Sequence, residues 1–170
     1  MKIVLYNALL GLICFMLTAC VGLQNKITAP DAISLQEIEG SYSYVFRNEL
    51  VITGERYDAG NILQIAKIND DTAYVSMNLS FYNGHSGGIE GIARLVDNKL
   101  ILEKQPYVNE PEKCVVTLTF SKDNIVTSCN YAENPVCTYY HGARGTLDGH
   151  KFPRKSKRKI HKLDELGKRD

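Results

Sequence analysis

The sequence predicts an all-β domain, a small antiparallel β-barrel or β-sandwich of about seven or eight strands, followed by a flexible basic C-terminal tail. The first reason is the alternation in residues 73–82, where apolar side chains share one face and polar or amphipathic ones the other. The second is that all five prolines fall between the predicted strands, where a missing N–H interrupts no ladder. The third is a series of turn-forming clusters, such as Asn69-Asp70-Asp71.

Short strands follow one another along the chain after an expected N-terminal helix. That helix begins within residues 28–31, with Pro30 in its first turn, continues to about Glu37 and ends by Gly40. Strands are expected at residues 41–51, 61–68, 73–82, 99–104, 114–120 and 125–131. Residues 89–96 fit both helical spacing and strand alternation, so their structure stays open at this point.

The N-terminus has the pattern of an export signal. Lys2 is followed by an apolar run from Ile3 to Leu17, which is shorter than the roughly 20 residues that a transmembrane helix needs. The run ends in Leu17-Thr18-Ala19-Cys20, which resembles the lipobox of bacterial lipoproteins. The resemblance implies cleavage before Cys20, a diacylglycerol on its thiol and an acyl chain on the new amino group. Two or more acyl chains hold a protein on a membrane stably.

The same resemblance implies a location. Val21 follows the cysteine, where the enterobacterial members of the family that stay at the inner membrane carry Asp. We therefore expect an outer-membrane lipoprotein that faces the periplasm. The predicted organisation is a signal peptide at 1–19, a lipidated tether and short helix at 20–39, a β domain at 40–150 and a disordered basic tail at 151–170.

Three cysteines remain once the signal is removed and Cys20 is lipidated. An exported location is oxidising, so we expect one disulfide and one thiol left over. A four-residue loop after Phe120 would place Cys114 diagonally across a hairpin from Cys129, at the edge of disulfide reach. This favours Cys114–Cys129, with Cys129–Cys137 as the competing pair. We expect no metal site and no cofactor, because there is no C-x-x-C and the four histidines sit at no ligand spacing.

Charge is divided unevenly along the chain. Residues 151–170 hold nine Lys or Arg against three acidic residues, whereas residues 20–150 hold ten against sixteen. A basic tail suits anionic cell-wall polymer, lipopolysaccharide or lipid headgroups. The candidate contacts in this tail are Lys155, Lys157, Arg158 and Lys159. Nucleic acid is not an expected partner of a lipid-anchored exported protein.

Two glycine-rich segments carry the remaining motifs. Gly84-His85-Ser86-Gly87-Gly88 fits the G-x-S-x-G pattern of a hydrolase nucleophile elbow, which needs a preceding strand and a following helix. Residues 73–82 have one polar, solvent-facing side, whereas the central strand of such a hydrolase is buried on both faces. Asn83-Gly84 is also a preferred start of a tight hairpin turn. We expect no enzymatic activity and keep catalysis by Ser86 as an alternative.

The second glycine-rich segment, residues 141–145, places Arg144 on a turn. That side chain either faces an anion or partner carboxylate, or pairs with an acid of the body. Together with the NGH, GIA and C-x-x-T-L-T-F strings, this segment resembles small exported bacterial proteins of unknown function. The resemblance implies a further cysteine pair near Gly87 and His141, which this chain lacks, and no activity.

These features predict a non-enzymatic binding or inhibitory module. The expected build is similar to that of periplasmic lysozyme inhibitors, which are lipidated, small, β-rich and disulfide-bonded. An acidic body would complement a basic cell-wall hydrolase such as lysozyme. The alternative is a structural envelope lipoprotein whose basic tail binds anionic polymer.

Overall fold

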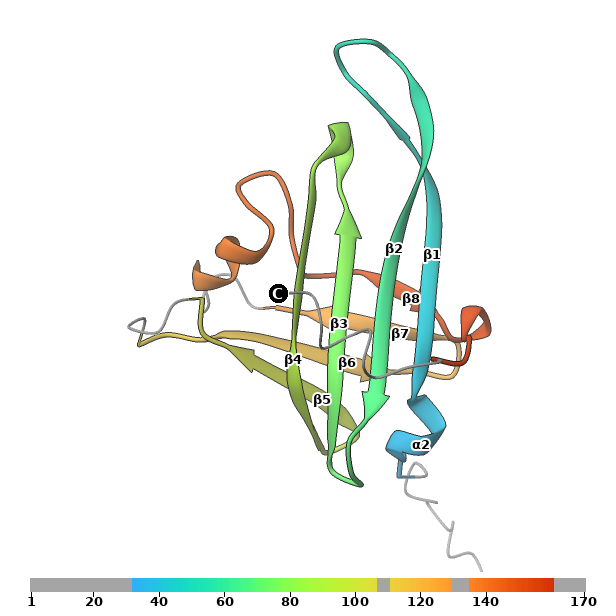
Figure 1. Ribbon diagram of the computed structural model, residues 1–170, viewed down its shortest axis with the longest axis vertical. Coiled ribbons are helices and arrows are strands. Elements are labelled where there is room, and N and C mark those ends of the chain that lie inside the picture. The colour runs from blue at the N-terminus through green and yellow to red at the C-terminus, as the bar shows by residue number, and fades with distance from the viewer. Residues whose placement is uncertain (1–31, 107–110, 130–134, 161–170) are drawn as a thin grey trace, which may run out of the picture. The chain divides into compact units, whose positions relative to one another are not determined.

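The computed structural model describes residues 32–106, 111–129 and 135–160. Eight antiparallel strands form one sheet, and each strand pairs with the next along the chain (Figure 1). The strands are β1 (Gly40–Glu49), β2 (Arg56–Lys67), β3 (Thr72–Ser80), β4 (Ser86–Val96), β5 (Lys99–Lys104), β6 (Cys114–Phe120), β7 (Asn124–Ser128) and β8 (Lys151–Pro153). The predicted all-β fold is confirmed, and residues 89–96 belong to a strand.

The sheet curls into a nearly closed barrel. Ser41 of β1 bridges to Arg158, just beyond β8, through two backbone hydrogen bonds of 2.9 and 2.8 Å. The hydroxyl of Ser156 accepts a further hydrogen bond from the Ser43 N–H at 3.0 Å. These bonds join the first and last parts of the sheet at Ser41 and Ser43, where the edge of β1 would otherwise be open to pairing with another chain.

The barrel interior follows from the alternation read in the sequence. Ala73, Val75, Met77 and Leu79 of β3 are buried together with Phe81 just beyond it. A short helix, α2 (Leu35–Ile38), covers one end of the barrel with two buried apolar side chains, Leu35 and Ile38. Ser34 caps this helix by accepting a hydrogen bond from the Glu37 N–H, and the buried Tyr42 hydroxyl donates to the Ile38 carbonyl at 2.7 Å. The helix begins later than the sequence predicted, at Leu35.

Two tight turns adopt the backbone that their residues favour. Asn83 and Gly84, between β3 and β4, have φ values of 58° and 74°. Asp97 and Asn98, between β4 and β5, have φ values of 48° and 60°. Positive φ at both central residues suits the right-handed twist of a hairpin, so these turns form where the sequence predicted them.

The C-terminal boundary of the barrel differs from the prediction. Residues 151–160, expected in a disordered tail, form β8, the 3₁₀ turn η3 (Arg154–Ser156) and the bridge to β1. Phe152 is fully buried, Arg154 pairs with Glu37 at 2.5 Å and the Lys157 ammonium donates to the Glu37 carbonyl. The buried Phe152, the bridge to β1 and the contacts with Glu37 together hold the segment on the barrel. Residues 161–170 lie outside the described residues.

The predicted disulfide is wrong in one partner. The register between β6 and β7 pairs Phe120 with Ile125, as expected. Cys114, however, is bonded to Cys137 across a Cα–Cα distance of 4.6 Å, and Cys129 is a buried free thiol. The reason is the 3₁₀ segment η2 (Pro135–Tyr140), which returns the chain to the start of β6. This tertiary contact could not be predicted from the geometry of the β6–β7 hairpin alone.

The N-terminal predictions lie outside the described residues. Residues 1–31 carry the expected signal, the lipobox and Cys20, so lipidation stays a prediction. Within residues 32–106, 111–129 and 135–160, no helix is long and apolar enough to cross a membrane.

We predict that Phe152→Ala lowers the free energy of unfolding by about 3–5 kcal/mol, because it empties a buried site in the strand that closes the barrel. Urea denaturation measures the change. The matched control is Lys151→Ala, an exposed neighbour on the same strand, which should change stability by less than about 0.5 kcal/mol. Equal denaturation midpoints for the two variants would contradict the role of β8.

Candidate functional site

The two glycine-rich segments noted in the sequence meet at one end of the barrel. They enclose an open hollow of about 450 Å³, which we call the end hollow. It is lined by His85, Ser86, Tyr139, Tyr140, His141, Gly142, Ala143 and Arg144. His85 directly precedes β4 and Ser86 opens it. Tyr139 and Tyr140 end η2 and residues 141–144 follow it, so segments more than 50 residues apart form one site.

Close packing explains why glycine stands at two of these positions. A Cβ on Gly87 would lie 2.7 Å from the Cα of His141 and 2.8 Å from the carbonyl oxygen of Tyr140. A Cβ on Gly145 would overlap the ring of Phe81. Only a residue without a side chain permits such approach, so these glycines let residues 139–145 lie directly on β3 and β4. The wall of the end hollow is therefore positioned by steric fit.

Arg144 and His85 connect the two walls. The Arg144 Nη1 lies 3.1 Å from the His85 Nε2, so the guanidinium donates and the imidazole accepts at that nitrogen. Within the described part of the chain, no carboxylate forms an ion pair with Arg144. The side chain is exposed, and four of its five N–H donors remain for other acceptors. Among the described residues, Arg144 therefore does not show the second of its two expected roles, pairing with an acid of the body.

Tyr140 separates the end hollow from a second hollow of about 340 Å³. The second hollow is lined by Ser76, Met77, Asn78, Gly88, Ile89, Glu90, Lys104 and Tyr140. The Lys104 ammonium lies 5.9 Å from the centre of the Tyr140 ring, within cation–π range. The Tyr140 hydroxyl is buried with no hydrogen-bond partner among the described residues, and burial raises its pKa. It therefore stays a neutral donor that an arriving acceptor atom would satisfy.

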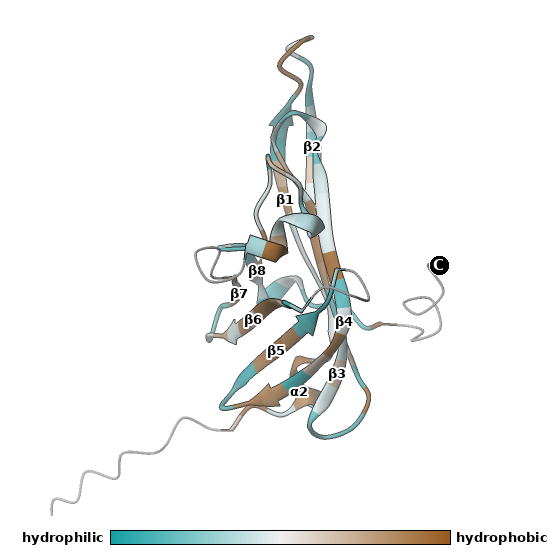
Figure 2. Cartoon of the chain, turned by 90° about the vertical axis from the view of Figure 1, so that its left-hand side faces the viewer, coloured by the Kyte–Doolittle hydropathy of each residue, from teal (hydrophilic) through white to brown (hydrophobic). Residues whose placement is uncertain are grey.

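A projecting hairpin tip lies at the same end of the barrel (Figure 1). We use this name for residues 50–55, which join β1 to β2. The Asn83 side chain accepts a hydrogen bond from the Val51 N–H at 3.0 Å, and the buried Asn48 amide donates to the Phe81 carbonyl at 2.7 Å. These bonds tie the tip to the β3–β4 turn. Ile52 is nevertheless 93% exposed and Val51 57% exposed, and Figure 2 shows the tip as an apolar end on a mixed hairpin.

Ser86 does not lie in the strand–turn–helix context of a nucleophile elbow. It opens strand β4 and pairs with Ser80 of the antiparallel strand β3. Two downstream residues that could complete a triad have other partners. His150 contacts the Asn61 amide and the Thr146 carbonyl, and Asp148 accepts from the Cys129 N–H.

The basic residues singled out near the C-terminus are not part of the end hollow. Lys157 and Arg158 make contacts with α2 and β1 respectively, and Lys155 and Lys159 are exposed. Sequence reasoning singled out Ser86 and Arg144, and noted His85 only as part of the G-x-S-x-G string. It did not single out Tyr139, Tyr140 or the hairpin tip. The apolar pair Val51-Ile52 beside a Thr-Gly turn was the available signal for the tip.

Comparison with models of protein families, with curated proteins and with solved structures found no match to this chain. The function is therefore argued from the geometry of the described residues.

We predict that the double variant Gly87→Cys/His141→Cys forms a new disulfide. A Cβ on Gly87 would lie 2.9 Å from the His141 Cβ. Disulfides span about 3.5–4.5 Å between Cβ atoms, so a shift of roughly 1 Å in residues 139–145 accommodates the bond. Peptide mass spectrometry of the non-reduced protein detects it. The matched control is Gly91→Cys/His141→Cys, about 13 Å further along β4. Failure of the first pair, or equal cross-linking of both, would contradict the contact.

Proposed function

We propose that this protein is an exported, lipid-anchored, non-enzymatic binding protein that recognises another protein through the end hollow and the hairpin tip. The observation that carries the proposal is that the end hollow and the hairpin tip lie at the same end of the barrel. An exposed apolar tip supplies area that can be removed from water. Beside it, Arg144, His85 and Tyr140 supply directional hydrogen-bonding groups. Buried apolar contact with a few placed polar groups is the usual anatomy of a protein interface.

The positions of α2 and the hairpin tip at opposite ends of the barrel suit an anchored protein. The described chain enters at α2, and Figure 1 places α2 at the end of the barrel opposite the hairpin tip. We propose that Cys20 carries the lipid, at an outer membrane and facing the periplasm. The twelve residues from Cys20 to Asp31 would span at most about 40 Å when extended. An attachment ahead of α2 leaves the hairpin tip and the end hollow at the far end, available to a partner.

The partner class that fits best is a cell-wall hydrolase such as lysozyme. Hydrolases that cleave glycosidic bonds carry two carboxylates in a substrate cleft. A narrow projecting hairpin can enter such a cleft, and the unused N–H donors of Arg144 are suited to a carboxylate. Glu55 of the tip is exposed and would attract a basic hydrolase, which speeds encounter more than it strengthens binding. Glu49 beside the tip is already paired with Arg56 at 2.8 Å.

A second candidate function rests on the opposite end of the barrel. Lys151, Lys155, Arg158 and Lys159 are exposed in the segment whose Arg154 and Lys157 contact Glu37 of α2, and further basic residues follow in the sequence. Such a cluster would bind anionic cell-wall polymer or lipopolysaccharide in a salt-dependent manner. In that case the protein is a structural envelope lipoprotein. Catalysis by Ser86 is a third, less supported alternative, because its backbone context is that of a hairpin.

We predict that Arg144→Ala and Ile52→Asp each weaken binding to lysozyme by tenfold or more, about 1.4 kcal/mol, because each removes a central contact of the interface. Calorimetry with the domain 21–170, and inhibition of peptidoglycan lysis, measure the loss. Lys155→Ala is the matched control at the opposite end and should leave affinity unchanged.

The same titration separates the two leading functions. Binding that survives physiological salt and depends on Arg144 supports recognition through the end hollow. If wild type shows no binding to any basic hydrolase, and retention on anionic polymer disappears with salt or with Lys155→Ala/Lys159→Ala, the proposed inhibitory function is wrong.

The anchor has an independent test. We predict that Cys20→Ser abolishes acylation and leaves the protein unprocessed or released from the membrane, because the thiol that accepts the diacylglycerol is gone. Fractionation and intact-mass measurement of the exported protein check this outcome. Full membrane partition of the variant at an unchanged mass would refute the lipobox interpretation.

A further inference from the structure

Three cysteines meet in the core beside the end hollow. The sulfur atoms of Cys114, Cys129 and Cys137 lie within 4.8 Å of one another, and all three residues are buried. Cys114 opens β6, Cys129 directly follows β7 and Cys137 lies in η2. The Cys129 thiol donates to the Cys137 sulfur at an Sγ–Sγ distance of 2.7 Å, while Cys137 is bonded to Cys114. A disulfide and a free thiol are therefore in direct contact.

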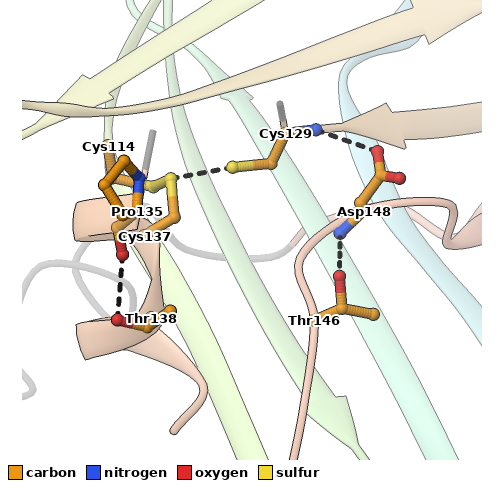
Figure 3. Close-up of a disulfide and its surroundings, with 7 residues drawn as sticks. All are labelled: Cys114, Cys129, Pro135, Cys137, Thr138, Thr146 and Asp148. Atoms are coloured by element: carbon orange, nitrogen blue, oxygen red, sulfur yellow. Dashed lines mark hydrogen bonds between the residues drawn. A yellow bond between two sulfur atoms is a disulfide. The ribbon is translucent and has the colours of Figure 1, made fainter. Parts of the chain in front are cut away.

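The arrangement is that of a thiol facing a disulfide it can attack. Figure 3 shows the Cys137 sulfur between those of Cys114 and Cys129. Thiol–disulfide exchange requires the attacking sulfur to approach one sulfur of an existing bond while the other departs. We propose that Cys137 is the shared half of two alternative disulfides, Cys114–Cys137 and Cys129–Cys137, which interconvert within the folded protein.

The exchange needs no outside oxidant or reductant, because the bond formed replaces the bond broken. The Cys129 thiol gives its proton to solvent, and the thiolate attacks the Cys137 sulfur. A Cys129–Cys137 bond forms as the Cys114–Cys137 bond breaks, and the bonding electron pair leaves on the Cys114 sulfur, which takes up a proton. The protein holds one disulfide and one thiol before and after, so no oxidant or reductant is consumed.

The surroundings of Cys129 set the rate of exchange. Burial, and then the carboxylate of Asp148, raise the pKa of the Cys129 thiol to about 11. Asp148 is held there because its carboxylate accepts the Cys129 N–H at 3.0 Å, as Figure 3 shows. At pH 8 only about one thiol in a thousand is a thiolate, so exchange is slow at neutral pH. Below that pKa the rate rises about tenfold for each pH unit.

Exchange would change what holds the wall of the end hollow. Cys137 precedes Tyr139, Tyr140 and His141 by only a few residues, so its bond tethers that wall to the barrel. In one isomer the tether runs to the start of β6, and in the other to the end of β7. The two disulfide isomers therefore hold the same wall of the end hollow at different points of the barrel.

The test follows the position of the free thiol in the full-length wild-type protein. The protein is kept folded at pH 7 or pH 9 for increasing times, quenched at pH 4, denatured and labelled with a maleimide. Cleavage after Lys122 and Glu133 separates the three cysteines for mass spectrometry. We expect label on both Cys114 and Cys129, none on Cys137, and faster approach to the final ratio at pH 9. Label on Cys129 alone at every time, or any substantial label on Cys137, would overturn the proposal.

Two variants give an independent measurement. Cys114→Ala should form the Cys129–Cys137 disulfide, so the denatured variant takes up no label at these positions. Cys129→Ala is the matched control, which should keep the Cys114–Cys137 disulfide and also take up none. If Cys114→Ala folds but shows two labelled thiols, Cys129 is not a partner of Cys137 and the proposal fails.

Discussion

The structure depends on closing the sheet between its first and last strands. The backbone pair Ser41–Arg158 and the buried Phe152 turn a row of eight sequentially paired strands into a nearly closed barrel. Without that closure β1 and β8 would expose unpaired edges and the core would be open to water on one side. The cations around Phe152 stay at the surface because their charged groups need water or a partner such as Glu37.

Closure also places the candidate site. Once the barrel is formed, residues 135–150 cross one end of it between β7 and β8, and they fit only where β4 has no side chain, at Gly87. The disulfide from Cys137 to Cys114 holds the start of the same segment. A steric fit at one position and a covalent bond at another leave Tyr139 and Arg144 exposed at a set position, with Tyr140 partly buried between them. A binding surface built this way loses little conformational entropy when a partner arrives.

Much of the architecture could be predicted from short-range patterns. The period of two in residues 73–82, the Asn83-Gly84 and Asp97-Asn98 turns and the Phe120–Ile125 register were readable because a strand's side chains alternate and these turns need positive φ. The end of α2 was also readable, because Gly40 predicted that the helix stops before it. For the candidate site, Ser86 and Arg144 were identified on glycine-rich turns, but their meeting was not predicted, since nothing local relates segments that far apart.

The sequence by itself determined the all-β class, the two tight turns and the alternation of apolar and polar faces in residues 73–82, because those depend on neighbours along the chain. The tertiary structure alone decided that residues 151–160 belong to the barrel, since one buried phenylalanine and a backbone bridge outweigh a run of charges. It also decided that Cys114 bonds to Cys137, because η2 folds back across β6. Contacts between distant segments are selected by the shape and packing of the whole core, which no local pattern contains.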